Sequence, residues 1–214
     1  MPYLAIEKTL SISRFSTYRT AILGAIGDDC HHTALELYEW NANLSSALFF
    51  PLHIYEVVLR NAISDAISCR YPNDWPTNIV FQNSLSHFDR SYLIGLLDNY
   101  SSIGKLLPEI KLAWWENILT RRHDGRIWKD HIMSIFPNST ETNPETLRLK
   151  LNRSCRIIRK IRNRVAHHEP IFNQPDLQSV YPYIEETIAW RCNDTVDWLK
   201  RLERATSILN SPVL

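Results

Sequence analysis

The sequence contains little glycine, with five residues in a chain of 214. Sheet-rich folds with many tight turns, and the phosphate-binding loops of nucleotide enzymes, usually need more, because glycine adopts backbone conformations that other residues avoid. The sustained alternation of apolar and polar residues that is typical of half-buried strands is also missing. The sequence therefore favours long helices, and we predict an all-α fold.

Excess charge and clustered cysteines are absent too. The formal net charge is +1, so a signal for nucleic acid must be sought in local clusters rather than in the whole chain. The four cysteines lie too far apart for the Cys-x-x-C spacing of a zinc knuckle or redox pair, and we interpret them as free thiols in a reducing cytosol. Outside the candidate site described below, the only paired histidines are His31 and His32, which no patterned carboxylates accompany, so we expect neither a metal nor a cofactor.

The chain also lacks a long apolar run. Its N-terminus has no basic region followed by an apolar stretch of signal length, and no run approaches the ~18 apolar residues that a membrane span needs. We therefore expect a cytoplasmic protein without a membrane partner.

Apolar residues recur at helical spacing along most of the chain, with turn formers between the periodic segments. The predicted helices cover residues 11–26, 32–50, 52–69, 89–99, 109–120, 124–136, 145–168, 176–190 and 194–209. Pro51 should separate the second helix from the third, because proline has no amide hydrogen to donate. Residues 136–144 form the clearest interior linker. We expect one domain over residues 1–214, whose C-terminal helices pack on the 52–70 helix.

The predicted helix at 145–168 combines an apolar stripe with a basic surface. The stripe steps by four and three residues and should face the core; it comprises Leu147, Leu151, Ser154, Ile158, Ile161, Val165 and His168. Between Arg148 and Glu169 lie eight basic residues and one acid. The basic residues are Arg148, Lys150, Arg153, Arg156, Arg159, Lys160, Arg162 and Arg164. Such density predicts a surface for RNA, since arginine offers two parallel hydrogen bonds to a phosphate; the alternative is a solvated charged face.

The two histidines near the end of this helix should differ in role. At ~100° per residue, Asn163 and His167 stack on the face opposite the core, where the neighbouring arginines favour a neutral imidazole at His167 that can accept a proton. His168 continues the apolar stripe, so a structural histidine or an orienter of its neighbour is expected there. Arg162 lies roughly 140° around the helix from His167, and the two can cooperate only if the helix unwinds near Ala166 or a partner chain supplies one of them.

The segment Ile161-Arg-Asn-Arg-Val-Ala-His-His-Glu-Pro-Ile-Phe172 resembles the signature of the Abi-like (abortive infection) proteins, a branch of the HEPN ribonuclease superfamily. The HEPN motif is an arginine, a polar residue, three further residues and a histidine, which Arg162, Asn163 and His167 match. Upstream blocks that resemble the same family are Leu10–Tyr18, Ala34–Asn41, Leu52–Ala62, Trp114–Leu119 and Ile127–His131.

The resemblance implies a HEPN-type helical bundle with additional N-terminal and central helices, which dimerises and cleaves RNA without a metal, in toxin-like defence against phage. By position Arg162 and His167 would be catalytic, with Asn163 and His168 in support. Glu56 and Arg60 would fix or extend the site, or form a structural salt bridge instead. The cations expected to contact RNA are Arg156, Arg159, Lys160 and Arg164.

Toxins of the superfamily that nucleotidyltransferase antitoxins neutralise carry a tyrosine two residues after the motif histidine. That position is Glu169 here, so this type of antitoxin is not implied and the regulator stays open. Two other functions are compatible with a basic helical face: an RNA-binding or sensor module without catalysis, and a helical protein that docks an acidic partner. Either could operate without His167, so the complete Arg/Asn/His set favours the ribonuclease.

Overall fold

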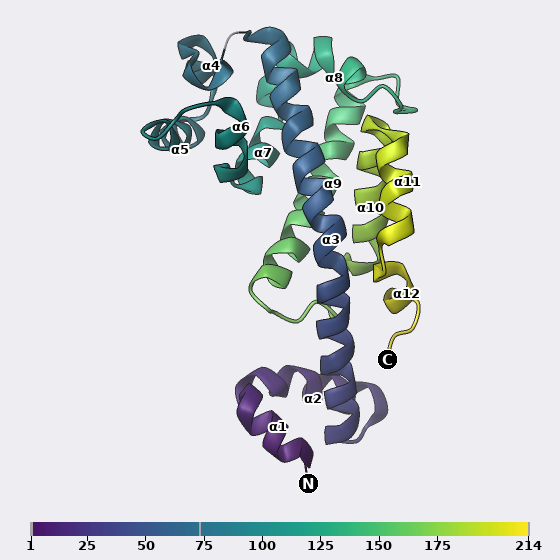
Figure 1. Ribbon diagram of the computed structural model, residues 1–214. Coiled ribbons are helices and arrows are strands. Elements are labelled where there is room, and N and C mark those ends of the chain that lie inside the picture. The colour runs from purple at the N-terminus through teal and green to yellow at the C-terminus, as the bar shows by residue number, and fades with distance from the viewer. Residues whose placement is uncertain (1, 73, 214) are drawn as a thin grey trace.

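The structure, a computed structural model, describes residues 2–72 and 74–213, and within these ranges all regular secondary structure is helical (Figure 1). The all-α prediction is therefore confirmed. The α-helices are α1 (Pro2–Leu10), α2 (Ile12–Ile26), α3 (His31–Arg70), α4 (Ile79–Ser84), α5 (His87–Leu97), α6 (Ile103–Leu106), α7 (Leu112–Ile118), α8 (Lys129–Ile135), α9 (Pro144–Ala166), α10 (Leu177–Arg191), α11 (Asn193–Leu202) and α12 (Ala205–Leu209).

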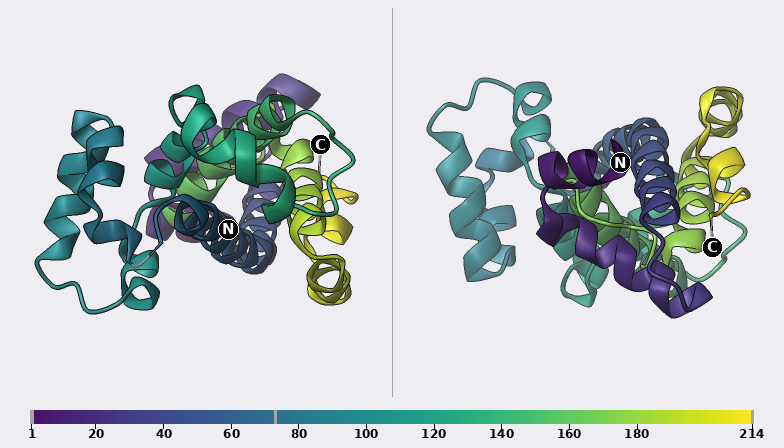
Figure 2. Two further views of the ribbon diagram at one scale, coloured as in Figure 1. Left: turned by 90° about the horizontal axis from the view of Figure 1, so that it is seen from above. Right: turned by 90° about the horizontal axis from the view of Figure 1, so that it is seen from below.

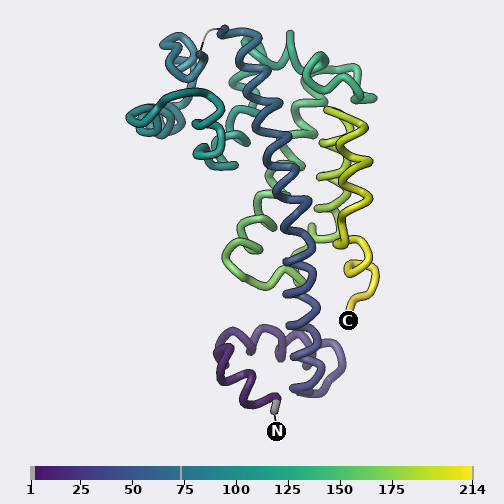
Figure 3. The backbone as a smooth tube through the Cα atoms, viewed as in Figure 1, coloured from purple at the N-terminus to yellow at the C-terminus, as the bar shows by residue number. Residues whose placement is uncertain are grey.

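One helix, α3, runs through the whole fold as a single rod of 40 residues (Figure 3). The predicted break at Pro51 is wrong. Proline removes one backbone hydrogen bond and crowds the preceding turn, a cost of about 3 kcal/mol in a helix interior. Here Pro51 is itself buried, and the side chains before and after it, such as Leu48 and Leu52, lie in the same core. Burial of apolar surface on both sides of the proline stabilises the continuous helix.

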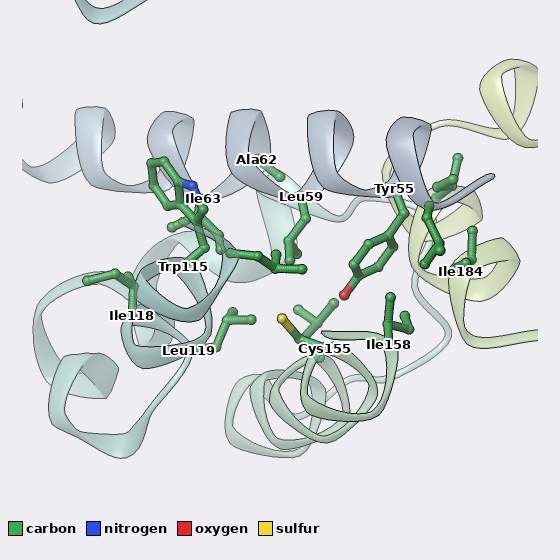
Figure 4. Close-up of a cluster of buried hydrophobic side chains, with 14 of the residues drawn as sticks. Tyr55, Leu59, Ala62, Ile63, Trp115, Ile118, Leu119, Cys155, Ile158 and Ile184 are labelled. Atoms are coloured by element: carbon green, nitrogen blue, oxygen red, sulfur yellow. The ribbon is translucent and has the colours of Figure 1, made fainter. Parts of the chain in front are cut away.

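The main core forms where α3 packs against α7, α8, α9 and α10. Figure 4 shows its centre, where Tyr55, Leu59 and Ile63 of α3 point toward Trp115 of α7 and Ile158 of α9. Seen along α3, the segment around α4–α6 and the C-terminal helices lie on opposite sides of it (Figure 2). The C-terminal helix α10 contacts α3, as expected from the sequence, and it also contacts α9.

A second, smaller core lies at the N-terminal end of α3. There α2 packs across the first turns of α3 and buries Phe15, Tyr18 and Ile22 against Ala34 and Leu37. Helix α1, which the sequence patterns did not predict, contacts both α2 and α3. Figure 1 shows this N-terminal pair of helices below the end of α9, which runs antiparallel to α3. The arrangement brings α2 close to the last residues of the predicted motif.

Several predicted helices are shorter or divided. The predicted 194–209 helix is two helices, α11 and α12, and the predicted 109–120 and 124–136 helices contain only the short α7 and α8 together with 3-10 and π-helical turns. Helix α4 lies in a segment with weak patterning. The predicted linker is an irregular connection between α8 and α9, and Asn138 ties it to α10 by hydrogen bonds to the carbonyls of Ala189 and Trp190.

Helix α3 is also the one helix among the described residues that is long and apolar enough, by length and composition, to cross a membrane. Its 18-residue window has a mean hydropathy of 1.3. The central helix of a folded core meets the same criterion, because it too must present apolar residues to its neighbours. In this fold α3 packs against α2, α7, α8, α9 and α10, and 33% of that window is buried, so the criterion is weak evidence for a membrane span.

Candidate nucleic-acid interface

Helix α9 carries the predicted site, and its sequence explains its orientation. Asn143 caps the start by accepting a hydrogen bond from the amide of Thr146 at 3.0 Å, and Pro144 occupies the first turn, where its missing amide hydrogen costs nothing. The apolar stripe from Leu147 to Val165 is buried as predicted. Burial of this stripe against α3, α7 and α10 fixes which side chains of α9 remain on the surface.

The end of α9 is a Schellman turn. His167 is the C-cap residue, His168 follows with φ of 55°, and two backbone hydrogen bonds close the turn: His168 N to Val165 O at 3.1 Å and Glu169 N to Arg164 O at 2.8 Å. Pro170 comes next, four residues after the last helical position, in agreement with the predicted stop. The helix thus ends at Ala166. The sequence identifies this position as the one where the helix must unwind if Arg162 and His167 of the same chain are to cooperate.

His168 does not continue the apolar stripe. The prediction that it is a buried structural histidine is wrong, because the residue lies beyond the end of the helix, is exposed, and adopts a left-handed backbone conformation. The helical period of ~100° per residue no longer holds once the chain enters the Schellman turn. His167 is also exposed, so both histidines are accessible to a ligand.

The basic surface of α9 is less uncompensated than its sequence indicates. Arg156 and Arg159 both contact Glu116 of α7, at 3.4 and 2.6 Å, and Arg162 contacts Glu56 of α3 at 3.2 Å. Further ion pairs join Arg148 to Asp124, Lys150 to Glu141 and Arg164 to Glu169. Six of the eight cations contact a carboxylate of the same chain, so the density of basic residues is by itself weaker evidence for an RNA surface than it is in the sequence.

Two kinds of ion pair can be distinguished by which nitrogens are used. The buried Arg148 presents both Nε and Nη2 to Asp124, at 2.8 and 3.0 Å, and is a structural link between α9 and the turn at 124–128. In contrast, Arg156, Arg159 and Arg162 bond their carboxylates through Nε. Within the described part of the chain no hydrogen bond engages the Nη atoms of these three residues. Their terminal N–H groups can therefore still bind a phosphate.

Glu56 and Arg60 differ in what they contact. The Glu56 carboxylate holds Arg162, which assigns it to the site, whereas a Glu56–Arg60 salt bridge is not among the ion pairs of the described residues. The Nε atom of Arg60 is buried without a hydrogen-bond partner in that same part of the chain. Arg60 lies one turn beyond Glu56 on α3 and forms no ion pair among the described residues, so the structure assigns Glu56, and not Arg60, to a contact with the motif.

The remaining predicted residues occupy different places around the helix end. Asn163 is half-buried, and its backbone carbonyl accepts the amide of His167 at 3.0 Å. Lys160 is exposed. Arg164 turns back on its own chain, where its Nε donates to the carbonyl of Pro170 at 2.7 Å and its Nη1 lies 3.2 Å from Glu169. Arg164 thereby fastens the Schellman turn that follows the motif.

Sequence reasoning missed one residue of this group, Glu116. Its side chain is buried, and it joins α7 to two arginines of α9. The only signal in the sequence is that Glu116 directly follows Trp114 and Trp115, two core residues. An acidic residue next to a buried pair on a short helix can form an ion pair with a cation of the neighbouring helix. Nothing in the sequence names that cation.

Among residues 2–72 and 74–213, no group of three or more histidine, cysteine, aspartate or glutamate side chains is arranged to hold a metal ion. No family model matches the chain, and neither a curated protein nor a solved structure matches it significantly. The function of the chain therefore has to be inferred from the residues and geometry of the site.

Proposed function

We propose that this chain is a toxin-like endoribonuclease that cleaves RNA through its own 2′-hydroxyl, without a metal, at a site built on Arg162 and His167. The observation that carries the proposal is the end of α9, where His167 is exposed directly after the helix and Arg162, five residues earlier, is held by Glu56 through Nε alone. A fixed guanidinium with free terminal N–H groups and an accessible imidazole, both near the same helix end, are the two groups that phosphodiester cleavage needs.

In the proposed reaction His167 accepts the proton of a ribose 2′-hydroxyl. The 2′-oxygen then forms a bond to the adjacent phosphorus, the bond from phosphorus to the 5′-oxygen breaks, and that oxygen takes up a proton to leave as a hydroxyl. The products are a 2′,3′-cyclic phosphate and a 5′-hydroxyl end. Arg162 stabilises the negative charge that grows on the phosphate oxygens, a contribution of about 10²- to 10³-fold for one such donor.

The active form in this proposal is a two-fold homodimer. Two motifs would face one groove, so that the proton acceptor of one chain and the arginine of the other could act on the same phosphate. An exposed His167 beyond the helix end is compatible with action within one chain or across the axis. Mixing inactive His167→Ala and Arg162→Ala proteins distinguishes these possibilities, because heterodimers regain one complete site only if the residues act in trans.

The direct test is incubation of the purified protein with RNA in EDTA. We expect cleavage that leaves 2′,3′-cyclic ends, and we expect His167→Ala and Arg162→Ala each to lower the rate by about 10²-fold or more. His87→Ala and Arg201→Ala are matched controls, since both residues are exposed and lie outside the site. Loss of cleavage in EDTA, full activity of His167→Ala, or cleavage of a substrate with 2′-deoxyribose at the scissile position would each contradict the proposal.

One observation favours a second function. The carboxylates of Glu56 and Glu116 compensate much of the arginine charge, an arrangement that also suits an RNA-binding or sensor module that fixes its side chains without turnover. The same assay separates the two functions. A non-catalytic module would bind RNA with a strong dependence on salt and leave it intact, and His167→Ala would then bind as tightly as the unchanged protein.

A further inference from the structure

A cavity lies against the end of the candidate motif. It is half open to solvent, has a volume of about 640 Å³ and is lined by residues of α2, the first half of α3 and the end of α9. The two residues on either side of His167, Ala166 and His168, both line it. The cavity therefore adjoins the position of a phosphate bound at His167. Its volume falls within the usual range of small-molecule sites.

The cavity has aromatic walls and a cationic edge. Tyr38 and Tyr18 lie edge to face with ring centroids 5.1 Å apart, and Phe49 at the rim is 66% exposed although it is a large apolar side chain. Arg14 also lines the cavity, where its Nη1 donates to the carbonyl of His168 at 2.9 Å. This bond attaches α2 to the turn that carries the motif, so the cavity and His167 keep a fixed relation to each other.

Polar groups of the cavity can recognise the edge of a planar ring. Burial raises the pKa of Tyr18 to about 12, although a hydrogen bond with the Asn41 side chain lowers it, so the phenol stays protonated. Asn41 holds its carbonyl oxygen toward the amides of Ile171 and Phe172, at 2.7 and 3.0 Å, and this fixes the orientation of its side-chain amide. No hydrogen bond within the described residues engages the Ser45 hydroxyl.

We propose that this cavity is a nucleobase subsite, which binds the base next to the phosphodiester held at Arg162 and His167. The proposal rests on the proposed function for the identity of its ligand. The exposed ring of Phe49 and the half-buried ring of Tyr38 can stack on any base, Arg14 neutralises a flanking phosphate, and the hydroxyl groups of Tyr18 and Ser45 meet the polar edge of the base. An aliphatic side chain of a partner protein would leave these polar groups without partners, which makes a base the better occupant.

The experiment measures binding of the four nucleoside 5′-monophosphates and of a short RNA to the full chain, together with cleavage of that RNA. Two variants change the cavity: Phe49→Ala removes the exposed aromatic rim, and Ala42→Trp fills the space from an exposed lining position. Phe88→Ala is the matched control, since Phe88 is 75% exposed and lies on α5. Because Phe49 contributes little to the core, circular dichroism should show both phenylalanine variants folded.

We expect Phe49→Ala and Ala42→Trp to weaken binding of at least one monophosphate by about fivefold or more, the usual effect of losing one stacking contact. Cleavage by Phe49→Ala should show a higher KM with an unchanged kcat. Phe88→Ala should match the unchanged protein in all three measurements.

The outcomes separate this inference from the proposed function. Cleavage of RNA with unaltered KM and monophosphate affinity in both cavity variants would overturn the subsite and leave the ribonuclease standing. Monophosphate binding that both variants weaken, in a protein that cleaves no RNA, would support the subsite and overturn the ribonuclease. Variants that lose a dimer while monophosphate affinity is unaltered would assign the cavity to a second copy and overturn the subsite.

Discussion

Replacement of His168 by glycine should stabilise the protein. The residue holds φ at 55°, a left-handed conformation that costs a non-glycine residue about 1 kcal/mol, and its side chain is exposed and makes no contact that the turn requires. Glycine adopts this conformation without that cost. Both hydrogen bonds of the turn, and the one that Arg14 donates, use backbone atoms of the residue and would remain. We expect a gain of about 0.5–1 kcal/mol.

A gain of this size corresponds to a rise in Tm of about 2–3 °C for a chain of 214 residues, measurable by thermal or urea unfolding. Ala166→Gly is the matched control two positions away. It makes a similar change inside the last helical turn and should lower stability by about 0.5–1 kcal/mol, since glycine is disfavoured in helices. Gly27→Ala, at φ of 72° after α2, should also destabilise. A His168→Gly protein that unfolds as early as Ala166→Gly would refute this reasoning.

Three further predictions concern other buried groups. Burial lowers the pKa of His123 from 6.5 to about 4, so the unfolded chain takes up this proton first as the pH falls. Between about pH 6.5 and 4 the free energy of unfolding should therefore drop by about 3 kcal/mol. A His123→Gln protein whose stability falls with the same slope would contradict this. Burial raises the pKa of the Cys155 thiol to about 12. Thiol reagents at pH 8 should therefore leave this cysteine unlabelled in the native protein and label it in urea. Rapid labelling of the native protein would contradict the packing shown in Figure 4. Glu116→Gln should cost about 1–2 kcal/mol of stability and tighten RNA binding, because Arg156 and Arg159 lose their shared carboxylate; an unchanged RNA affinity would show that neither arginine meets RNA.

The sequence predicted the parts of the fold that depend on local periodicity. The stripe of α9 is readable because each of its apolar positions from Leu147 to Val165 meets the same core, and the start at Pro144 carries a recognisable cap. The predicted break at Pro51 is wrong for the opposite reason. A local rule about proline competes there with burial on both sides of it, and the extent of that burial depends on α7–α10, which lie far along the chain.

The candidate site, like the fold, can be predicted from the sequence only where it depends on local spacing. The spacing of Arg162 and His167 places both residues at the end of one helix, and the structure agrees. The carboxylates that hold the arginines lie elsewhere: Glu56 is 106 residues from Arg162, and Glu116 is 43 residues from Arg159. No pattern along the chain pairs them. The sequence-based placement of His168 is wrong because a helical projection does not hold beyond Ala166, where the helix ends.

The internal carboxylates would also reduce the repulsion between two basic helices in the proposed homodimer. Two faces with eight free cations each would repel each other strongly in a shared groove. In this chain six of the eight contact a carboxylate, so the long-range field is reduced, whereas the Nη atoms of three arginines stay available at short range. Repulsion between copies depends on the net charge, and recognition of a phosphate depends on the free N–H groups. Arginine, whose Nε can bind a carboxylate while its other nitrogens bind a phosphate, allows both at one surface; lysine, with a single nitrogen, does not.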